Sequence, residues 1–180
     1  MDNKKTDKKK LFVKILVPVL IAVTLTIIWV VKTHPTPTPI DKQTGNIADF
    51  VLEATSIDLN ALKEYNMPII IDFGSDSCIP CKAMAPILQT MNAEMQGKAI
   101  IKFVDVWKHS EAADGFPIQV IPTQVLFNAD GTPYVPSDDI GIKFDMYSSK
   151  DTGKHAFTVH QGGLTEKEMR AILADMGVSE

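Results

Sequence analysis

The sequence has only two cysteines, Cys78 and Cys81, and it has no nicotinamide or flavin fingerprint. Without such a fingerprint we expect no bound cofactor of these kinds. Internal repeats are absent as well. The composition is that of an ordinary globular protein, with 45% hydrophobic and 22% charged residues, which argues against wholesale disorder. At 180 residues the chain has room for one domain of usual size and some additional length.

Positive charge is scarce outside the N-terminus. Six lysines and two aspartates in the first 14 residues give a local charge of +4, whereas the whole chain carries −4, which leaves −8 for residues 15–180. An acidic body of this kind argues against nucleic acid or an anionic membrane surface as its partner. The basic N-terminus therefore needs a separate explanation.

That explanation is the apolar run at residues 11–31, "LFVKILVPVLIAVTLTIIWVV". A helix of this length spans about 30 Å, the thickness of a bilayer core, and Lys14 can snorkel to the interface. The excess of lysine before the run predicts a cytoplasmic tail at residues 1–10. A cleaved signal peptide is the alternative, but the run is long for one and no small-x-small cleavage site follows Val31. Neither cysteine lies near the end of the run, which excludes a lipid-modified anchor. We interpret residues 11–31 as a single-pass transmembrane signal anchor in the cell membrane, with the rest of the chain outside the cytoplasm.

Residues 32–46 follow as a stalk in which three prolines alternate with threonines, a pattern typical of extended chain. The globular domain is expected at residues 47–180, with residues 135–154 as a surface insertion. Strands separated by helices predict an α/β or α+β sheet with helices on both faces. We expect strands at residues 48–55, 67–75, 99–107, 122–131 and 155–163, and helices at residues 56–66, 78–95, 110–118 and 165–177.

The two cysteines allow three interpretations. A zinc site needs four ligands, and the pair supplies two; His155 and His160 have a suitable spacing but would lie on opposite faces of a strand. A structural disulfide would close a loop of a few residues and remove little entropy from the unfolded chain. A reactive pair is favoured, because Cys78 lies at a predicted helix start, where the N–H groups and the helix dipole stabilise a thiolate. Cys81 lies one turn further on the same face, and Pro80 suits the first helical turn.

The residues around this pair resemble the thioredoxin family. The resemblance comprises a buried strand that ends in Asp72-Phe73, the motif C-x-P-C-K at residues 78–82, and Pro86 five residues after the second cysteine. "VIPTQVLFNADG" resembles the family's cis-proline loop, strand and turn, and "GGLTEKEMRAIL" resembles its last helix. The resemblance covers roughly residues 48–178, apart from residues 135–154. It implies an α/β thioredoxin-like fold with a central mixed β-sheet flanked by helices.

The resemblance also implies roles for individual residues. Cys78 would be the attacking thiol and Cys81 the resolving thiol, so that Cys78–Cys81 would be the redox disulfide. Asp72 would move protons to and from Cys81, with Lys102 close enough to tune its pKa. Substrate-binding positions implied in this way are Ile79, Pro80, Ile121, Pro122 in the cis position, and Thr123.

The sequence departs from the family at three positions near the site: Ser77 and Gly74 replace tryptophans, and Ile79 replaces a glycine. Because Ile79 cannot stabilise the Cys78 thiolate further, we expect a reducing potential. We therefore predict a thiol-disulfide oxidoreductase that reduces disulfide-containing protein substrates outside the cytoplasm. A membrane electron conduit of the CcdA/DsbD type would recharge it. The alternatives are a disulfide oxidase or isomerase, and a metal-binding or redox-inert chaperone on the same fold.

Overall fold

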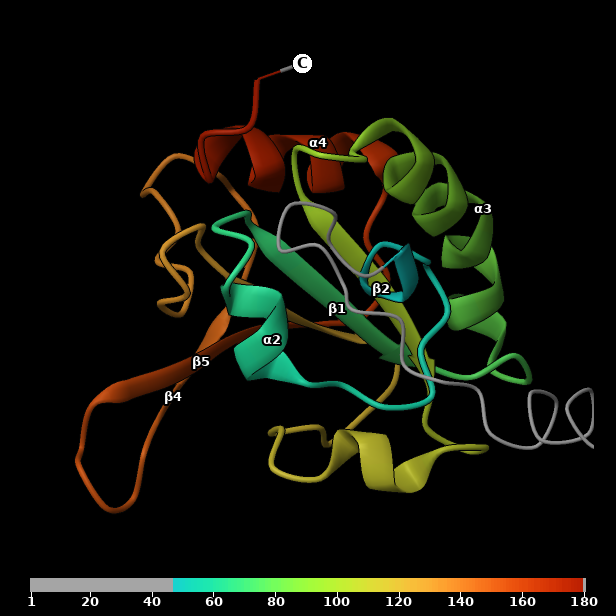
Figure 1. The fold of residues 1–180 in the computed structure, drawn as a ribbon, viewed down its shortest axis with the longest axis horizontal. Helices are drawn as coiled ribbons and strands as arrows, with labels where there is room; N and C mark the ends of the chain where they lie inside the picture. The colour runs from blue at the N-terminus through green and yellow to red at the C-terminus, as the bar shows by residue number, and fades with distance from the viewer. Residues whose placement is uncertain (1–46, 180) are drawn as a thin grey trace, which may run out of the picture. The chain divides into compact units, whose positions relative to one another are not determined.

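Figure 1 shows the computed structural model of the chain, which describes residues 47–179. The predicted tail, signal anchor and stalk at residues 1–46 lie outside the described residues. Within residues 47–179 no helix is long and apolar enough to cross a membrane. The membrane anchor therefore stays a prediction from the sequence.

A five-stranded mixed sheet forms the centre of the domain, with the strand order β2-β1-β3-β5-β4. Strands β1 and β2 are parallel, and the other neighbouring pairs are antiparallel. The arrangement confirms the predicted mixed sheet and places β1 and β3 in its interior. The strands are β1 (Ile69–Gly74), β2 (Ile100–Asp105), β3 (Thr123–Phe127), β4 (Asp145–Ser148) and β5 (His155–Gln161).

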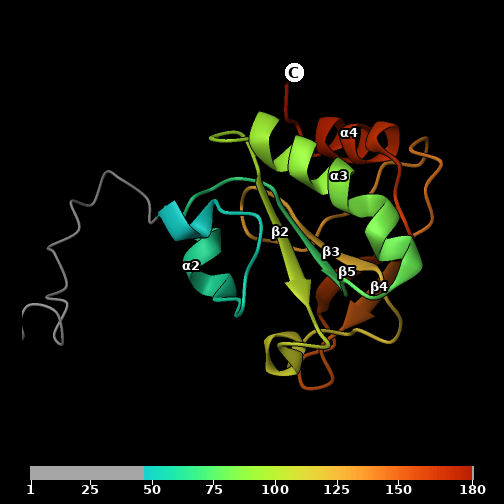
Figure 2. The same cartoon turned by 90° about the vertical axis from the view of Figure 1, so that its right-hand side faces the viewer.

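Helices cover both faces of this sheet (Figure 2). Buried side chains of α3 and α4 pack on one face together with Ile70 and Leu126, whereas Leu62 of α2 and Ala112 of η2 pack on the other with Ile71 and Phe73. Strand β1 is buried along its whole length on both faces, which explains its continuous apolar run. The helices are α2 (Leu59–Lys63), α3 (Ile79–Glu94), α4 (Glu166–Asp175) and the 3-10 turns η1 (Ile47–Asp49) and η2 (Ser110–Ala113).

Side-chain caps define where two of the helices begin. The Asp58 carboxylate accepts a hydrogen bond from Ala61 N at the start of α2. At the start of α4, Thr165 and Glu168 form a reciprocal capping box. The sequence offers Asp58 or Ser56 as the cap of α2, and Thr165 with Glu168 at the third position as the cap of α4. The structure uses Asp58 and the Thr165–Glu168 pair, and each cap satisfies N–H groups that have no partner within the helix.

Two segments differ from the sequence prediction. Residues 48–55 do not form a strand; η1 begins the segment, and only Glu53 bridges to Phe103 of β2. The Lys102 ammonium donates hydrogen bonds of 2.7 Å to the carbonyl oxygens of Ala48 and Val51. These two oxygens therefore bind a side chain in place of a neighbouring strand. In the predicted insertion, residues 145–148 form the edge strand β4 (Figure 1), whose four residues are too few to give a clear alternation in the sequence.

Candidate active site

The two cysteines lie where β1 passes into α3. Strand β1 ends at Gly74, and Cys78 is the N-cap residue of α3, with an extended backbone at φ −85° and ψ 126°. Cys78 is half-buried, whereas Cys81, one turn into the helix, has only 3% of its surface exposed. The geometry thus offers one accessible and one enclosed sulfur at the start of the same helix.

A second loop faces the accessible sulfur. The Ile121–Pro122 peptide bond is cis, which confirms the cis proline that the resemblance implies. The Cys78 Sγ atom lies 3.9 Å from the Ile121 carbonyl oxygen. Gly162 N donates a hydrogen bond to the Pro122 carbonyl at 2.9 Å and so fastens this loop to the end of β5.

The predicted substrate-binding positions divide into exposed and enclosed residues. Ile79, the residue after Cys78, is 83% exposed, and Ile121 beside the Cys78 sulfur is half-buried. Pro122 is buried against the protein, and Thr123 is fully buried and paired on both sides, with Phe73 of β1 and Gln161 of β5. The resemblance also implies that Ile121 and Thr123 expose backbone to a bound peptide. For Thr123 this expectation is wrong, because β3 already begins at this residue and the sheet buries it.

Asp72 lies on β1 with no exposed surface, on the face covered by α3. Its Oδ1 atom accepts a hydrogen bond of 2.5 Å from Gln124 Nε2, and its Oδ2 atom has no hydrogen-bond partner. Burial raises the pKa of Asp72 to about 7, and the hydrogen bond from Gln124 opposes this rise. A carboxyl group with a pKa near neutrality can both take up and release a proton under physiological conditions.

Cys81 and Asp72 meet at Gly74. A Cβ atom at Gly74 would lie 3.2 Å from Cys81 Sγ, 3.3 Å from Asp72 Oδ2 and 2.9 Å from Cε2 of Phe103, so any side chain here would displace a neighbour. Burial raises the pKa of the Cys81 thiol to about 12; its hydrogen bond with Cys78 and the Asp72 charge act in the same direction. Cys81 therefore remains a thiol until a base accepts its proton.

Lys102 does not lie beside Asp72, which corrects the expectation that it tunes this carboxyl group. In the β1–β2 register Lys102 pairs with Ile71, and Phe103 is the residue that pairs with Asp72. Successive side chains of a strand point to opposite faces, so Lys102 lies across the sheet from Asp72. Its ammonium binds the backbone of η1 and the segment after it instead.

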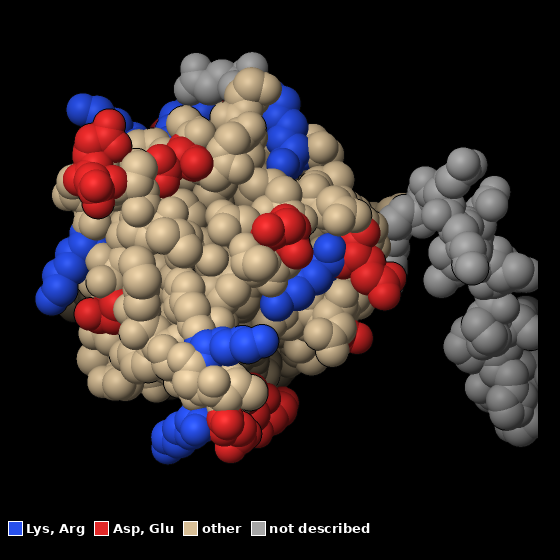
Figure 3. Space-filling model, turned by 90° about the vertical axis from the view of Figure 1, so that its left-hand side faces the viewer, with Lys and Arg blue, Asp and Glu red and all other residues tan. Residues whose placement is uncertain are grey.

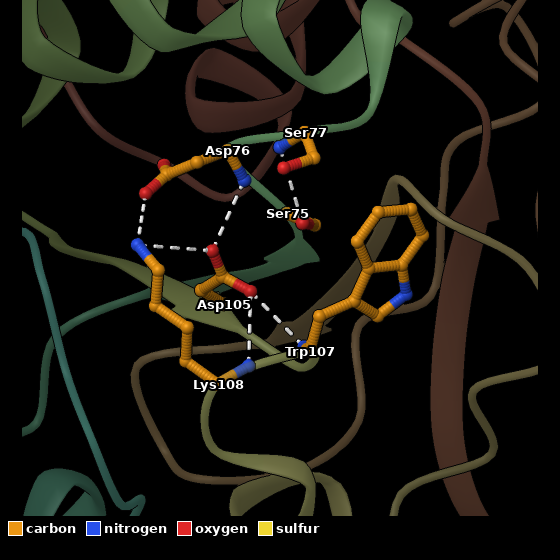
Figure 4. A network of polar contacts seen from close by, with 6 residues as sticks. All are labelled: Ser75, Asp76, Ser77, Asp105, Trp107 and Lys108. Atoms are coloured by element: carbon orange, nitrogen blue, oxygen red, sulfur yellow. Dashed lines mark hydrogen bonds and ion pairs between the residues drawn. The ribbon is translucent and has the colours of Figure 1, made fainter.

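A polar network under the active-site loop holds this loop in place (Figure 4). The buried Asp105 carboxylate at the end of β2 accepts hydrogen bonds from Asp76 N at 3.0 Å, Trp107 N at 3.0 Å and Lys108 N at 3.2 Å. The Lys108 ammonium pairs with both Asp105 and Asp76. One carboxylate thus joins the loop before Cys78 to the loop after β2. Sequence reasoning did not assign this role, although an aspartate at the end of an apolar strand is a visible signal for it.

Gln124 was also missed. It is a fully buried amide in β3, between Thr123 and three apolar residues, and it contacts Asp72 directly. A polar amide directly before an apolar strand run was the signal that could have identified it. Among residues 47–179, no group of three or more His, Cys, Asp or Glu side chains lies close enough together to hold a metal ion.

The known proteins similar to this chain are thioredoxins. The family model described as "Thioredoxin" matches residues 52–139. Thioredoxin 1 of Chlorobaculum tepidum is 36% identical over 66 residues, which are 37% of this chain and 65% of that protein. Thioredoxin of Staphylococcus aureus is 32% identical over 83 residues, which are 46% of this chain and 78% of that protein.

Among solved structures, chloroplastic thioredoxin z matches this chain with a TM-score of 0.50 and 19% sequence identity. The match covers 71% of this chain and 94% of the thioredoxin z chain. This likeness concerns the fold alone. The Chlorobaculum match spans slightly less than two thirds of that protein, whereas the Staphylococcus match spans more than three quarters of its own. With these relatives and the geometry above, the chain belongs to the thioredoxin family, and Cys78 and Cys81 are its C-x-x-C pair of the thiol-disulfide oxidoreductase type.

Proposed function

We propose that this protein reduces disulfide bonds of other proteins outside the cytoplasm, with Cys78 and Cys81 as its dithiol. The observation that carries the proposal is the pairing of an accessible thiol at a helix N-terminus with an enclosed thiol beside a buried carboxyl group. Cys78 is the N-cap residue of α3 and the sulfur of the pair that a substrate disulfide can reach. Burial keeps Cys81 protonated until Asp72 accepts its proton.

The reaction transfers two electrons from the dithiol to the substrate. The Cys78 thiolate attacks one sulfur of the substrate disulfide, forms a mixed disulfide and releases the other substrate sulfur as a thiolate, which takes a proton from solvent. Cys81 then gives its proton to Asp72, and its sulfur attacks Cys78. The mixed disulfide breaks, the second substrate sulfur leaves as a thiolate that takes a proton from solvent, and Cys78 and Cys81 end as a disulfide. Asp72 then releases its proton to solvent.

The surface around Cys78 suits a polypeptide substrate. Two exposed apolar side chains lie on the segments that adjoin the sulfur, Ile79 at 83% and Val120 at 50% exposed. Trp107, 66% exposed, lies on the loop after β2, which Asp105 joins to the loop before Cys78. Figure 4 shows the Trp107 indole pointing toward the side of the network on which the Ser75–Ser77 loop lies. Exposed aromatic and aliphatic side chains next to a reactive group contribute much of the energy of protein recognition. We propose that Trp107 supplies the aromatic contact that Gly74 and Ser77 cannot.

Neither positive nor negative charge dominates the side of the molecule shown in Figure 3. Lysine and arginine side chains are interspersed there with acidic ones, and neither sign forms a continuous patch on that face. The exposed apolar side chains near Cys78 are the basis on which we propose that substrates are selected.

The proposed location and electron donor are supported by the sequence alone. The apolar run at residues 11–31 and the lysines before it favour a signal anchor that leaves the thioredoxin domain outside the cytoplasm. A reductase there must be reduced again after each turnover, and a membrane electron conduit of the CcdA/DsbD type would provide those electrons.

The test is a Cys81→Ser variant of the full chain produced in cells. Without the resolving thiol, mixed disulfides on Cys78 should accumulate, and a Cys78→Ser, Cys81→Ser chain is the matched control. If the single variant traps no more protein than the double variant, Cys78 is not a nucleophile toward proteins. Equilibration of the wild-type chain with thiol buffers gives its potential. A midpoint well above about −200 mV would refute the reductase direction and favour an oxidase or isomerase.

A further inference from the structure

Gln124 faces Asp72 across the β1–β3 ladder, where the two residues are direct register partners. Its Nε2 atom lies 2.5 Å from Asp72 Oδ1 and 3.2 Å from the carbonyl oxygen of Gly162. A carbonyl oxygen only accepts hydrogen bonds, so the amide atom that faces Gly162 must be the nitrogen. Both amide hydrogens therefore have acceptors, one at Asp72 and one at Gly162.

This amide carries a cost that an apolar residue would avoid. The Gln124 Oε1 atom is buried and has no hydrogen-bond partner in the structure. Burial of an unpaired polar atom destabilises a fold, whereas a leucine or methionine would fill the same space on β3 without that penalty. The benefit of Gln124 must therefore come from its N–H groups, and the shortest of their contacts is with Asp72.

The two oxygens of Asp72 have different surroundings. Oδ1 accepts the hydrogen bond from Gln124, while Oδ2 has no partner and lies on the Gly74 side, where Cys81 Sγ also lies. Of the elements packed against Asp72, α3 contributes the titratable thiol of Cys81, β2 contributes the uncharged Phe103, and β3 contributes Gln124. Lys102 is on the opposite face of the sheet, so the direct polar partner of the carboxyl group is the Gln124 amide.

We propose that Gln124 is a positioning residue that keeps Oδ1 as an acceptor, so that the proton which Asp72 receives from Cys81 resides on Oδ2. A proton on Oδ1 would confront the Gln124 N–H, since two donors cannot share one hydrogen bond. The hydrogen bond also stabilises the ionised carboxylate that accepts the proton. This inference rests on the proposed dithiol function.

The test compares wild-type, Gln124→Met and Thr158→Val full-length chains in their single-turnover reaction with DTNB. The first thionitrobenzoate released reports the attack by Cys78, and the second reports the resolving step by Cys81. Gln124→Met removes the donor with little change in volume. The pH at the inflection of the second-step rate should rise by about one unit in this variant. That is the shift expected when a charged group loses one hydrogen bond. Near pH 7 the second step should then be roughly fivefold slower.

Thr158→Val is the matched control, because Thr158 is also fully buried and polar but donates its hydrogen bond to the Tyr134 carbonyl, away from Asp72. It should leave the inflection unchanged. If the Gln124→Met inflection coincides with that of the wild type, or if rates fall equally at every pH, Gln124 has only a structural role and the inference is overturned.

Two further measurements keep the inference separate from the proposed function. Carbon-13 NMR of the Asp72 carboxyl carbon follows its ionisation without any turnover, and it should show the same upward movement in Gln124→Met. Gln124→Leu serves as the second variant if the methionine variant does not fold. Failure of the reduced wild-type chain to release a second thionitrobenzoate would contradict the dithiol function itself, whereas a normal second release with no change in the variants would contradict only the role of Gln124.

Discussion

Replacing Asp72 by asparagine removes a buried charge from the centre of the domain and keeps the shape of the side chain. The carbonyl oxygen of the new amide side chain can still accept the hydrogen bond from Gln124, so the packing around β1 should be retained. What changes is the response of stability to pH. The wild-type carboxyl group must ionise inside the protein as the pH rises, and the asparagine does not ionise at all.

The magnitude follows from the pKa of Asp72, which burial raises from 3.8 to about 7. Between these two values the folded chain binds more protons than the unfolded chain, so stability falls as the pH rises. A difference of about three pH units at about 1.4 kcal/mol each gives about 4 kcal/mol. We expect Asp72→Asn to unfold with a free energy similar to that of the wild type at about pH 4, and to be more stable by up to about 4 kcal/mol at about pH 9.

Urea denaturation of both full-length chains across this pH range measures the difference directly. Asp105→Asn is the matched control, and its effect on the free energy of unfolding should have the opposite sign. Burial raises the pKa of Asp105, but the backbone N–H groups of Asp76, Trp107 and Lys108 and the Lys108 ammonium outweigh it and lower the pKa below its usual range. Asp105→Asn should therefore be less stable than the wild type at neutral pH, and this deficit should shrink as the pH falls through the lowered pKa. A stability difference for Asp72→Asn that is the same at both ends of the pH range would refute the reasoning.

Three further substitutions test the site. Gly74→Ala places a methyl group 2.9 Å from Phe103, and thermal unfolding should show a loss of about 1–3 kcal/mol; unchanged stability would mean that the ring moves aside freely. Trp107→Ala should raise KM for a protein disulfide roughly tenfold with little change in kcat, and an unchanged KM would exclude the indole from substrate contact. Lys102→Met should leave the pH profile of the resolving step unchanged but lower stability, because the carbonyl oxygens of Ala48 and Val51 lose their donor. A shift of this pH profile in Lys102→Met would show that Lys102 does influence Asp72.

The elements that the sequence predicted correctly are those whose signal is local. The apolar run of β1, the Asp58 cap of α2, and the Thr165–Glu168 capping box of α4 depend on residues within one or two turns of each other. The C-x-P-C motif likewise places both sulfurs on the first turn of α3. Periodicity and capping operate over these short distances, so the chain itself contains the information.

The errors concern positions that depend on strand register. Lys102 and Phe103 are neighbours in the sequence, yet only one of them can lie on the same face of the sheet as Asp72. A shift of one residue in the alignment of two strands exchanges the faces, and no local pattern fixes that alignment. The same reason applies to Thr123, whose pairing on both sides depends on where β1 and β5 lie.

The sequence by itself determined that this protein has an α/β domain with a reactive cysteine pair at the start of a helix, since spacing and helix capping are properties of neighbouring residues. It also carries the apolar run on which the proposed membrane location depends. Only the tertiary structure decided what surrounds the buried carboxyl group. Burial between β1, β3 and α3 gives Asp72 a pKa near neutrality, and the pairing of β1 with β3 brings Gln124 to it from 52 residues away. Proton affinity depends on desolvation and on contacts between distant strands, and these exist only once the sheet has formed.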